Sequence, residues 1–199
     1  MPGHDPLLVS LDEVDAVLEL GDAVKAAYPY LSGFTGITLV LYGDTPLISL
    51  ETLTKVIDAT QRHDIVVLGM RPADPGAYGR LKCNKAGELE AIVEFKDATE
   101  EEKSIALCNS GVIAVKGKIS DLVEKITNDN AKGEYYLTDI VKIGRSEGLS
   151  CGIVEGKTEE LLGINTREEL YYAEQYLQNQ LRTKAMLNGV TLLDASSVY

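Results

Sequence analysis

Asp44 is the residue most suited to chemistry, because it follows Gly43 and an apolar, partly β-branched run over residues 37–41. A run of this kind without polar alternation predicts a strand buried on both faces, and Pro46 cannot extend it as a central strand. Asp44 is therefore expected at the carboxyl end of a strand, where open α/β sheets bind ligands. A carboxylate there suits Mg²⁺, which prefers oxygen ligands shared with substrate phosphates. An ordinary Gly-Asp-x-Pro turn is the alternative.

The composition argues against several other chemistries. Thirty-one acidic and 19 basic residues give a net charge of −12, which opposes non-specific nucleic-acid binding but leaves nucleotide binding open. Two histidines and three scattered cysteines argue against a histidine-based nucleophile and a structural zinc site, and they fit a reducing compartment. No secretory signal and no apolar run of ~20 residues are present. We therefore expect a cytoplasmic protein without a membrane partner.

The elements that must position Asp44 are predicted from periodicity. Ser49 is a candidate N-cap for a helix over residues 50–57, and residues 64–70 form a second apolar run. This strand–helix–strand unit favours a parallel sheet. Downstream, we expect a hairpin (80–83 with 90–94), two strands broken at residues 109–111 (105–108 and 112–115), helices at 119–126 and 135–147, and a strand at 151–154. Thr166 and Glu169 have the spacing of a capping box that opens a long helix.

Other polar or glycine residues lie where these elements begin or end. Gly79 permits close approach of a ligand to the backbone, Glu94 ends an apolar strand, and Asn109 could bond sugar hydroxyls. The segment 134–139 places acidic groups at a helix start, and Asn165 precedes the capping box. Each has a purely structural alternative. Gly79 would be a loop glycine, Glu94 a solvated strand end and Asn109 a β-bulge residue. The segment 134–139 would be a helix cap, and Asn165 an ordinary helix-start residue.

The motifs form a specific series when they are taken in order. They are Leu-Tyr-Gly-Asp-x-Pro-Leu, Asp-Pro-x-x-Tyr-Gly-Arg, Ile-Val-Glu-x-Lys-Asp-Ala-Thr, Asn-Ser-Gly, Gly-Glu-Tyr-Tyr-Leu-Thr-Asp and Gly-Ile-Asn-x-Arg. From about Leu20 to Tyr199, the chain resembles the uridyltransferase half of the bacterial bifunctional N-acetylglucosamine-1-phosphate uridyltransferase/glucosamine-1-phosphate N-acetyltransferase.

The resemblance implies a fold and a reaction. The fold is an α/β, Rossmann-like nucleotidyltransferase domain over residues 1–165, a linker helix over 166–188 and the start of a left-handed β-helix over 189–199. The reaction converts UTP and N-acetylglucosamine 1-phosphate into UDP-N-acetylglucosamine and pyrophosphate, a step in cell-envelope precursor synthesis. The resemblance implies that Asp44 and Asn165 hold Mg²⁺ and that no other catalytic side chain is needed. It assigns substrate contacts to Tyr42, Gly43, Asp44, Gly79, Glu94, Asn109, Tyr136, Thr138 and Asn165.

The chain departs from the family pattern near its ends. Residues 1–35 contain no Gly-rich triphosphate loop, and the segment that reads uracil is reduced to residues 20–24. We therefore expect the sheet to lack its first strand. We also expect a fragment that does not catalyse the reaction alone at a family-like rate and that requires a complementing N-terminal fragment. The alternative is a catalytically dead sugar-nucleotide-binding or structural remnant, with the helix over 166–187 pairing into a homo-oligomer.

Overall fold

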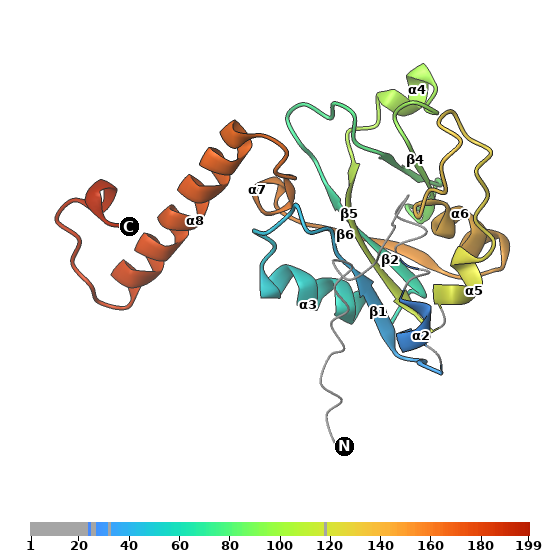
Figure 1. The fold of residues 1–199 in the computed structure, drawn as a ribbon, viewed down its shortest axis with the longest axis horizontal. Helices are drawn as coiled ribbons and strands as arrows, with labels where there is room; N and C mark the ends of the chain where they lie inside the picture. Colours follow the sequence, from blue (N-terminus) through green and yellow to red (C-terminus); the bar gives the residue numbers. More distant parts are fainter. Residues whose placement is uncertain (1–23, 25–26, 32, 118) are drawn as a thin grey trace.

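The computed structural model describes residue 24 and residues 27–31, 33–117 and 119–199. These residues form a six-stranded sheet in the order β4-β3-β5-β2-β6, with β1 also paired to β5 (Figure 1). The strands are β1 (Ile37–Val40), β2 (Ile65–Met70), β3 (Arg80–Cys83), β4 (Leu89–Val93), β5 (Cys108–Lys116) and β6 (Cys151–Glu155). The predicted α/β class is confirmed.

Strand β2 is the centre of the core, and its alternate side chains point to opposite faces of the sheet. Ile65 and Val67 belong to an apolar cluster with α5 (Ile119–Val123) and α6 (Asp139–Ser146). Val66, Leu68 and Met70 belong to a second cluster with α3 (Leu50–Ala59) and α7 (Thr158–Leu161). All six residues of β2 are buried, so the domain has a helix–sheet–helix arrangement.

The predicted parallel sheet is wrong around β1. Strands β1 and β2 both run antiparallel to β5, which pairs with each of them. Among the described strands, β2 with β6 is the parallel pair. The strand–helix–strand unit therefore flanks an inserted strand that is distant in sequence. Apolar periodicity predicts that a strand exists but carries no information about its neighbour.

Strand β1 is also less buried than its sequence predicts. Ile37 is 37% exposed and the other β1 residues are half-buried, while Leu41, directly after the strand, is 43% exposed. Within the described chain β1 pairs on one side only, with β5, and this explains the exposure. The expected absence of a first strand concerns residues 1–35, of which 1–23, 25–26 and 32 lie outside the described residues.

Strand β5 corrects a further prediction. Residues 109–111 do not break it into two strands; β5 is continuous from Cys108 to Lys116. The register against β2 shifts across this segment, where Val67 faces Ile113 and Gly69 faces Asn109. Gly111 has φ of +91°, a conformation that glycine adopts without a Cβ penalty. Between these two pairs, Ser110, Gly111 and Val112 lie outside the regular ladder with β2, and Asn109 is the first paired residue beyond them.

The remaining helices differ from the predictions mainly at their ends. The short helices are α2 (Tyr28–Leu31) and α4 (Glu100–Lys103). Helix α6 begins at Asp139 rather than at residue 135, because the preceding turn buries Leu137 and directs Thr138 to Glu94. Helix α5 ends at Val123 instead of residue 126.

Helix α8 (Arg167–Leu187) confirms the predicted capping box and the long C-terminal helix. It leads away from the sheet and is followed by a short 3-10 turn, η2 (Ala195–Ser197) (Figure 1). The boundaries predicted for a linker helix and a following domain stay predictions. No helix within the described ranges is long and apolar enough to span a bilayer.

Candidate functional site

A cleft of about 380 Å³ opens at the end of the sheet where β1, β5 and the loop before β3 meet. It contains six of the nine residues that the sequence predicts for the site: Tyr42, Asp44, Gly79, Glu94, Asn109 and Asn165. These residues come from positions 42 to 165, so the fold gathers most of the chain's motifs around one space.

Asp44 and Asn165 converge beside Gly163. The backbone N–H of Ile164 donates to the carbonyl of Asp44 at 2.8 Å, which joins the two segments. A Cβ built at Gly163 would lie 2.9 Å from Asp44 Oδ2 and 3.5 Å from Asn165 Nδ2. The two side chains therefore approach a common point, and the absence of a side chain at residue 163 leaves room for it.

Asn165 is positioned by the start of α8. One carboxylate oxygen of Glu169 accepts from the backbone N–H groups of Asn165 and Thr166, each at 2.7 Å. Thr166 Oγ1 accepts from the N–H of Glu169 at 3.1 Å. These bonds hold the pKa of Glu169 below its usual value. The capping box thus fixes the backbone that carries the Asn165 amide.

Tyr42 forms a wall of the cleft and packs on the backbone of β5. A Cβ at Gly111 would lie 2.4 Å from Tyr42 Cε2, so the ring occupies the space that any other residue type would fill. Burial raises the pKa of the Tyr42 hydroxyl, and the nearby carboxylates of Glu94 and Asp44 raise it further. Tyr42 is therefore a neutral hydrogen-bonding group at physiological pH.

Gly79 and Glu94 lie against each other, and both line the cleft. A Cβ at Gly79 would be 3.1 Å from Ile92 Cγ2 and 3.4 Å from both carboxylate oxygens of Glu94. The carbonyl of Gly79 accepts from the N–H of Asn109 at 2.8 Å. Residue 79 therefore lies where the loop, β4 and β5 pack closely, and a side chain there would press on Ile92.

The loop that carries Gly79 is held by Arg80, whose role the sequence did not reveal. Arg80 is only 2% exposed. Its guanidinium donates to the carbonyl of Gly76 at 3.0 Å, to those of Pro75 and Lys103 at 3.3 Å each, and to that of Tyr78. A planar fork with several N–H donors suits such a set of acceptors.

Glu94 and Asn109 present polar groups to the cleft. Thr138 Oγ1 donates to Glu94 Oε1 at 2.9 Å. Burial nevertheless raises the pKa of Glu94 above its usual value, because it outweighs this hydrogen bond and the attraction of Lys132. Asn109 Oδ1 accepts from the N–H of Gly111 at 3.0 Å. Within the described residues, its amide Nδ2 makes no hydrogen bond and remains free for a ligand.

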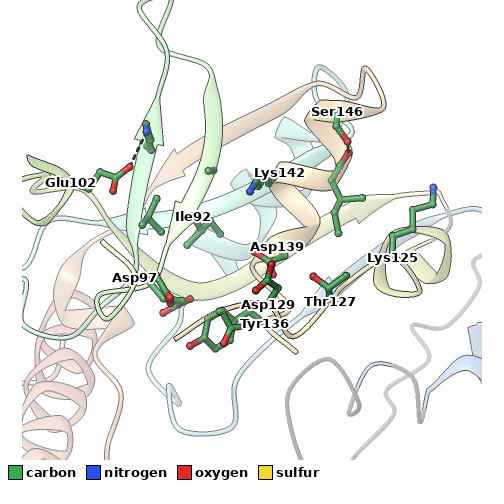
Figure 2. Close-up of a pocket in the computed structure, with 16 residues that line it drawn as sticks. Ile92, Asp97, Glu102, Lys125, Thr127, Asp129, Tyr136, Asp139, Lys142 and Ser146 are labelled. Atoms are coloured by element: carbon green, nitrogen blue, oxygen red, sulfur yellow. Dashed lines mark hydrogen bonds and ion pairs between the residues drawn. The ribbon is translucent and has the colours of Figure 1, made fainter. Parts of the chain in front are cut away.

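A second and larger cleft, of about 580 Å³, adjoins the first and shares Glu94 with it. Figure 2 shows Asp97, Asp129, Asp139 and Tyr136 gathered at one end of this space. The hydroxyl of Tyr136 is buried without a hydrogen-bond partner among the described residues. Burial raises the pKa of Asp139, and the neighbouring Asp97 raises it further while Lys142 lowers it.

Three predicted residues lie outside the walls of the first cleft. Tyr136 lines the second cleft, Thr138 is buried behind Glu94, and Gly43 connects Tyr42 to Asp44 with nothing near the position of a Cβ. The cleft also contains residues that the sequence did not single out, including Tyr78, Ser110 and Gly163. Each lies within two residues of a predicted residue and inside the same motif, and this proximity in sequence was the signal that could have found it.

The donor atoms fit a hard cation. The described residues hold no group of three or more histidine, cysteine, aspartate or glutamate side chains able to bind a metal. Asp44 and Asn165 bring a carboxylate and a side-chain amide near one point, with Asp44 Oδ2 and Asn165 Nδ2 closest to it. Two such ligands are sufficient for a cation that takes its other ligands from water and substrate phosphates, as Mg²⁺ does.

Comparison with known proteins supports a nucleotidyltransferase fold. The structure resembles a nucleoside-diphosphate-sugar pyrophosphorylase from Vibrio cholerae, with a TM-score of 0.58 and 15% identity over 78% of this chain and 64% of that one. It also resembles a 4-diphosphocytidyl-2C-methyl-D-erythritol synthase from Anaerococcus prevotii, with a TM-score of 0.55 and 17% identity over 82% and 68% of the chains. These identities show the fold alone.

Sequence similarity is much closer to one group of bacterial proteins. The bifunctional protein GlmU of Rhodospirillum rubrum is 55% identical over 181 residues, which are 89% of this chain and 40% of that protein. The GlmU proteins of Paramagnetospirillum magneticum and Roseobacter denitrificans are 49% and 46% identical over 92% and 98% of this chain, covering 41% and 43% of their lengths. No family model matches the sequence. The chain spans about 40% of the length of these relatives, and over that span it belongs to the GlmU family.

Proposed function

We propose that the first cleft is the sugar-nucleotide site of a uridyltransferase. The reaction joins N-acetylglucosamine 1-phosphate to the uridylyl group of UTP and forms UDP-N-acetylglucosamine. The observation that carries this proposal is the convergence of Asp44 and Asn165 in one cleft with Gly79, Glu94 and Asn109. Family membership and the nucleotidyltransferase fold support it.

The chain's own residues would bind and orient the two substrates. Glu94 and the free Asn109 amide can bond sugar hydroxyls and the acetamido group, and the bare backbone at Gly79 lets the sugar approach closely. In the reaction, a phosphate oxygen of the sugar phosphate attacks the α-phosphorus of UTP, and the bond to the pyrophosphate leaving group breaks. No covalent intermediate on the protein is needed, so positioning and charge neutralisation supply the catalysis.

We propose that the cation is Mg²⁺, held by Asp44 and Asn165. When bound, it would neutralise phosphate charge and orient the diphosphate. Gly163 lies beside both proposed ligands. A side chain at this position would displace Asp44 Oδ2, which lies 2.9 Å from the position of a Cβ. The positions of the two proposed cation ligands therefore depend on residue 163 being a glycine.

Binding of UDP-N-acetylglucosamine, measured by titration calorimetry with and without Mg²⁺, tests the proposal. The wild-type chain is expected to bind the nucleotide sugar more tightly with Mg²⁺ present. Asp44→Asn should weaken Mg²⁺-dependent binding by at least about tenfold, which corresponds to about 1.4 kcal/mol. Asp58→Asn is the matched control, because Asp58 is exposed on α3.

Two outcomes would contradict the proposal: no binding by the folded wild-type chain, or binding that Asp44→Asn leaves unchanged. A turnover assay with UTP and N-acetylglucosamine 1-phosphate separates an active site from a binding module. We expect turnover far below a family-like rate, because the sequence contains no Gly-rich triphosphate loop and each lost phosphate donor costs about 3 kcal/mol.

A further inference from the structure

Glu160 is a buried carboxylate that the proposed reaction does not use. It lies in α7 and is only 5% exposed. Among the described residues, those that line the first cleft do not include Glu160, which instead lines a separate pocket of about 300 Å³ beside the start of α3. Burying a charge is costly unless hydrogen bonds compensate for it. The partners of Glu160 therefore indicate which parts of the fold this carboxylate holds together.

Three donors from the start of α3 converge on one oxygen of Glu160. Oε2 accepts from Thr52 Oγ1 at 2.7 Å, from Ser49 Oγ at 2.8 Å and from the backbone N–H of Ser49 at 3.3 Å. The Ser49 hydroxyl, as the N-cap of α3, also accepts from the N–H of Thr52 at 3.2 Å. A negative charge is favoured at a helix N-terminus, and hydrogen bonds to a charged group are stronger than neutral ones. Glu160 therefore joins α7 firmly to the start of α3.

This connection links the two segments that carry the proposed cation ligands. Ser49 follows Asp44 by five positions, and Glu160 precedes Asn165 by five. Near the ligands, the N–H of Ile164 donates to the carbonyl of Asp44 at 2.8 Å. At the far ends of the segments, Glu160 accepts from Ser49. The two segments thus run antiparallel and are joined at two points, which fixes their relative orientation, whereas one point alone would let them rotate.

We propose that Glu160 is a positioning residue of the cation site, which acts by holding the segments of Asp44 and Asn165 side by side. The inference rests on the proposed function and adds to it a residue that lies outside the cleft. Without the Glu160 carboxylate, the two ligand side chains lose their fixed relative orientation. Residues that orient metal ligands from behind typically change metal affinity about 10- to 100-fold when they are replaced.

Titration calorimetry of UDP-N-acetylglucosamine, with and without Mg²⁺, tests the proposal on the whole 199-residue chain. The informative quantity is the ratio of the dissociation constant without Mg²⁺ to the dissociation constant with Mg²⁺. Glu160→Ala should reduce this ratio about tenfold. The dissociation constant without Mg²⁺ should stay at the wild-type value, because the sugar contacts proposed for Gly79, Glu94 and Asn109 come from other elements.

Two variants of Thr52 separate the hydrogen bond from the packing. Thr52 is buried, and Thr52→Val keeps its shape but removes the donor closest to Glu160; this change should reduce the ratio about threefold. Thr52→Ser keeps the hydroxyl and should preserve the ratio. When Glu160→Ala is already present, Thr52→Val should have no further effect on the ratio, because the acceptor of its hydrogen bond is gone.

Asp64→Asn is the matched control for a general loss of stability. Asp64 Oδ2 accepts from the N–H of Ser150 at 2.8 Å and from its Oγ at 2.7 Å, so it also joins two distant segments through a serine. Asp64 directly precedes β2, whereas the first cleft lies at the other end of that strand, where Gly69 faces Asn109. The control should unfold at a lower urea concentration than the wild type but keep the wild-type ratio.

Hydrogen exchange measured by NMR reports on the connection without any nucleotide. The N–H of Ile164 bonds to the carbonyl of Asp44, and its exchange requires the two segments to separate locally. This amide should exchange about tenfold faster in Glu160→Ala than in Asp64→Asn, because only the first variant loses the second connection between the segments.

Three results would overturn the inference. They are a ratio in Glu160→Ala or Thr52→Val equal to that of the wild type, a fall of the same size in Asp64→Asn, and exchange at Ile164 that does not respond to Glu160→Ala. If the wild type binds in a Mg²⁺-dependent manner and the variants do too, Glu160 has no such role and the proposed function stands. A folded wild-type chain that does not bind the nucleotide sugar contradicts the proposed function itself, and the role of Glu160 with it.

Discussion

Replacing Gly111 by alanine would test the packing that builds the wall of the site. Gly111 has φ of +91°, and the position of its missing Cβ lies 2.4 Å from Tyr42 Cε2 and 2.5 Å from Cδ2. Alanine therefore meets two separate penalties, one in the backbone and one against the ring. Both come from the same irregularity in β5 that presents Asn109 to the cleft.

The two penalties can be given magnitudes. A left-handed backbone costs a non-glycine residue about 1–2 kcal/mol, and alanine recovers about 0.4–1 kcal/mol by restricting the unfolded chain. The net backbone cost is then about 1 kcal/mol. Overpacking against the ring adds about 1–3 kcal/mol. Gly111→Ala should therefore lower the free energy of unfolding by about 2–4 kcal/mol.

Urea denaturation of four variants separates these contributions. Gly117→Ala is the control for the backbone alone, because Gly117 has φ of +86° and nothing lies within 4 Å of its Cβ position; it should cost about 1 kcal/mol. Combining Gly111→Ala with Tyr42→Ala removes the ring. Relative to Tyr42→Ala alone, the added cost of Gly111→Ala should fall to the level of the control. Equal costs for Gly111→Ala and Gly117→Ala, or full additivity with Tyr42→Ala, would refute the reasoning.

Three further perturbations have defined outcomes. Arg80→Lys should lower the free energy of unfolding by about 2–4 kcal/mol, measured in urea, because an ammonium cannot serve the carbonyls of Pro75, Gly76, Tyr78 and Lys103 together; a loss below about 0.5 kcal/mol would show that the loop is held otherwise. For Glu94, burial raises the folded-state pKa above the unfolded value near 4.5, so wild-type stability falls as pH rises from the unfolded pKa through the folded one. Above that window Glu94→Gln should be the more stable protein, by about 1.4 kcal/mol for each pH unit that separates the two pKa values; parallel stability–pH curves would contradict this. For Glu160, burial opposes ionisation, but hydrogen bonds from Thr52 and Ser49 outweigh it and lower the pKa below 4.5. The contribution of ionised Glu160 to the free energy of unfolding is therefore complete above pH 4.5 and is lost as the pH falls through the lowered pKa. Glu160→Gln should cost about 1.5–3 kcal/mol at neutral pH, with the difference from wild type shrinking as pH falls, and a constant difference would rule this out.

Much of the chain could be interpreted from local patterns. The apolar run over residues 64–70 predicts the fully buried β2, and the Thr166–Glu169 spacing predicts the capping box that opens α8. These features depend on residues within one or two turns of each other. The motif series identifies the family for a related reason, since each motif is a short string of residue types whose meaning does not depend on its neighbours in space.

The tertiary structure alone decided how the elements combine. Strand β5 enters between β1 and β2, so these two strands run in the same direction but do not pair, and each is antiparallel to β5; β1 is half-exposed. Arg80 looks like an ordinary loop-edge cation in the sequence, and only the fold surrounds it with carbonyl groups from two segments. The meeting of Asp44 with Asn165 also depends on the fold, because Gly163 provides the space where their side chains converge. The physical reason is the sequence separation of the residues that interact. Turns, caps and periodicity are set by neighbours along the chain. Strand partners and clefts, in contrast, are set by the burial of whole faces, to which residues far apart in sequence contribute together.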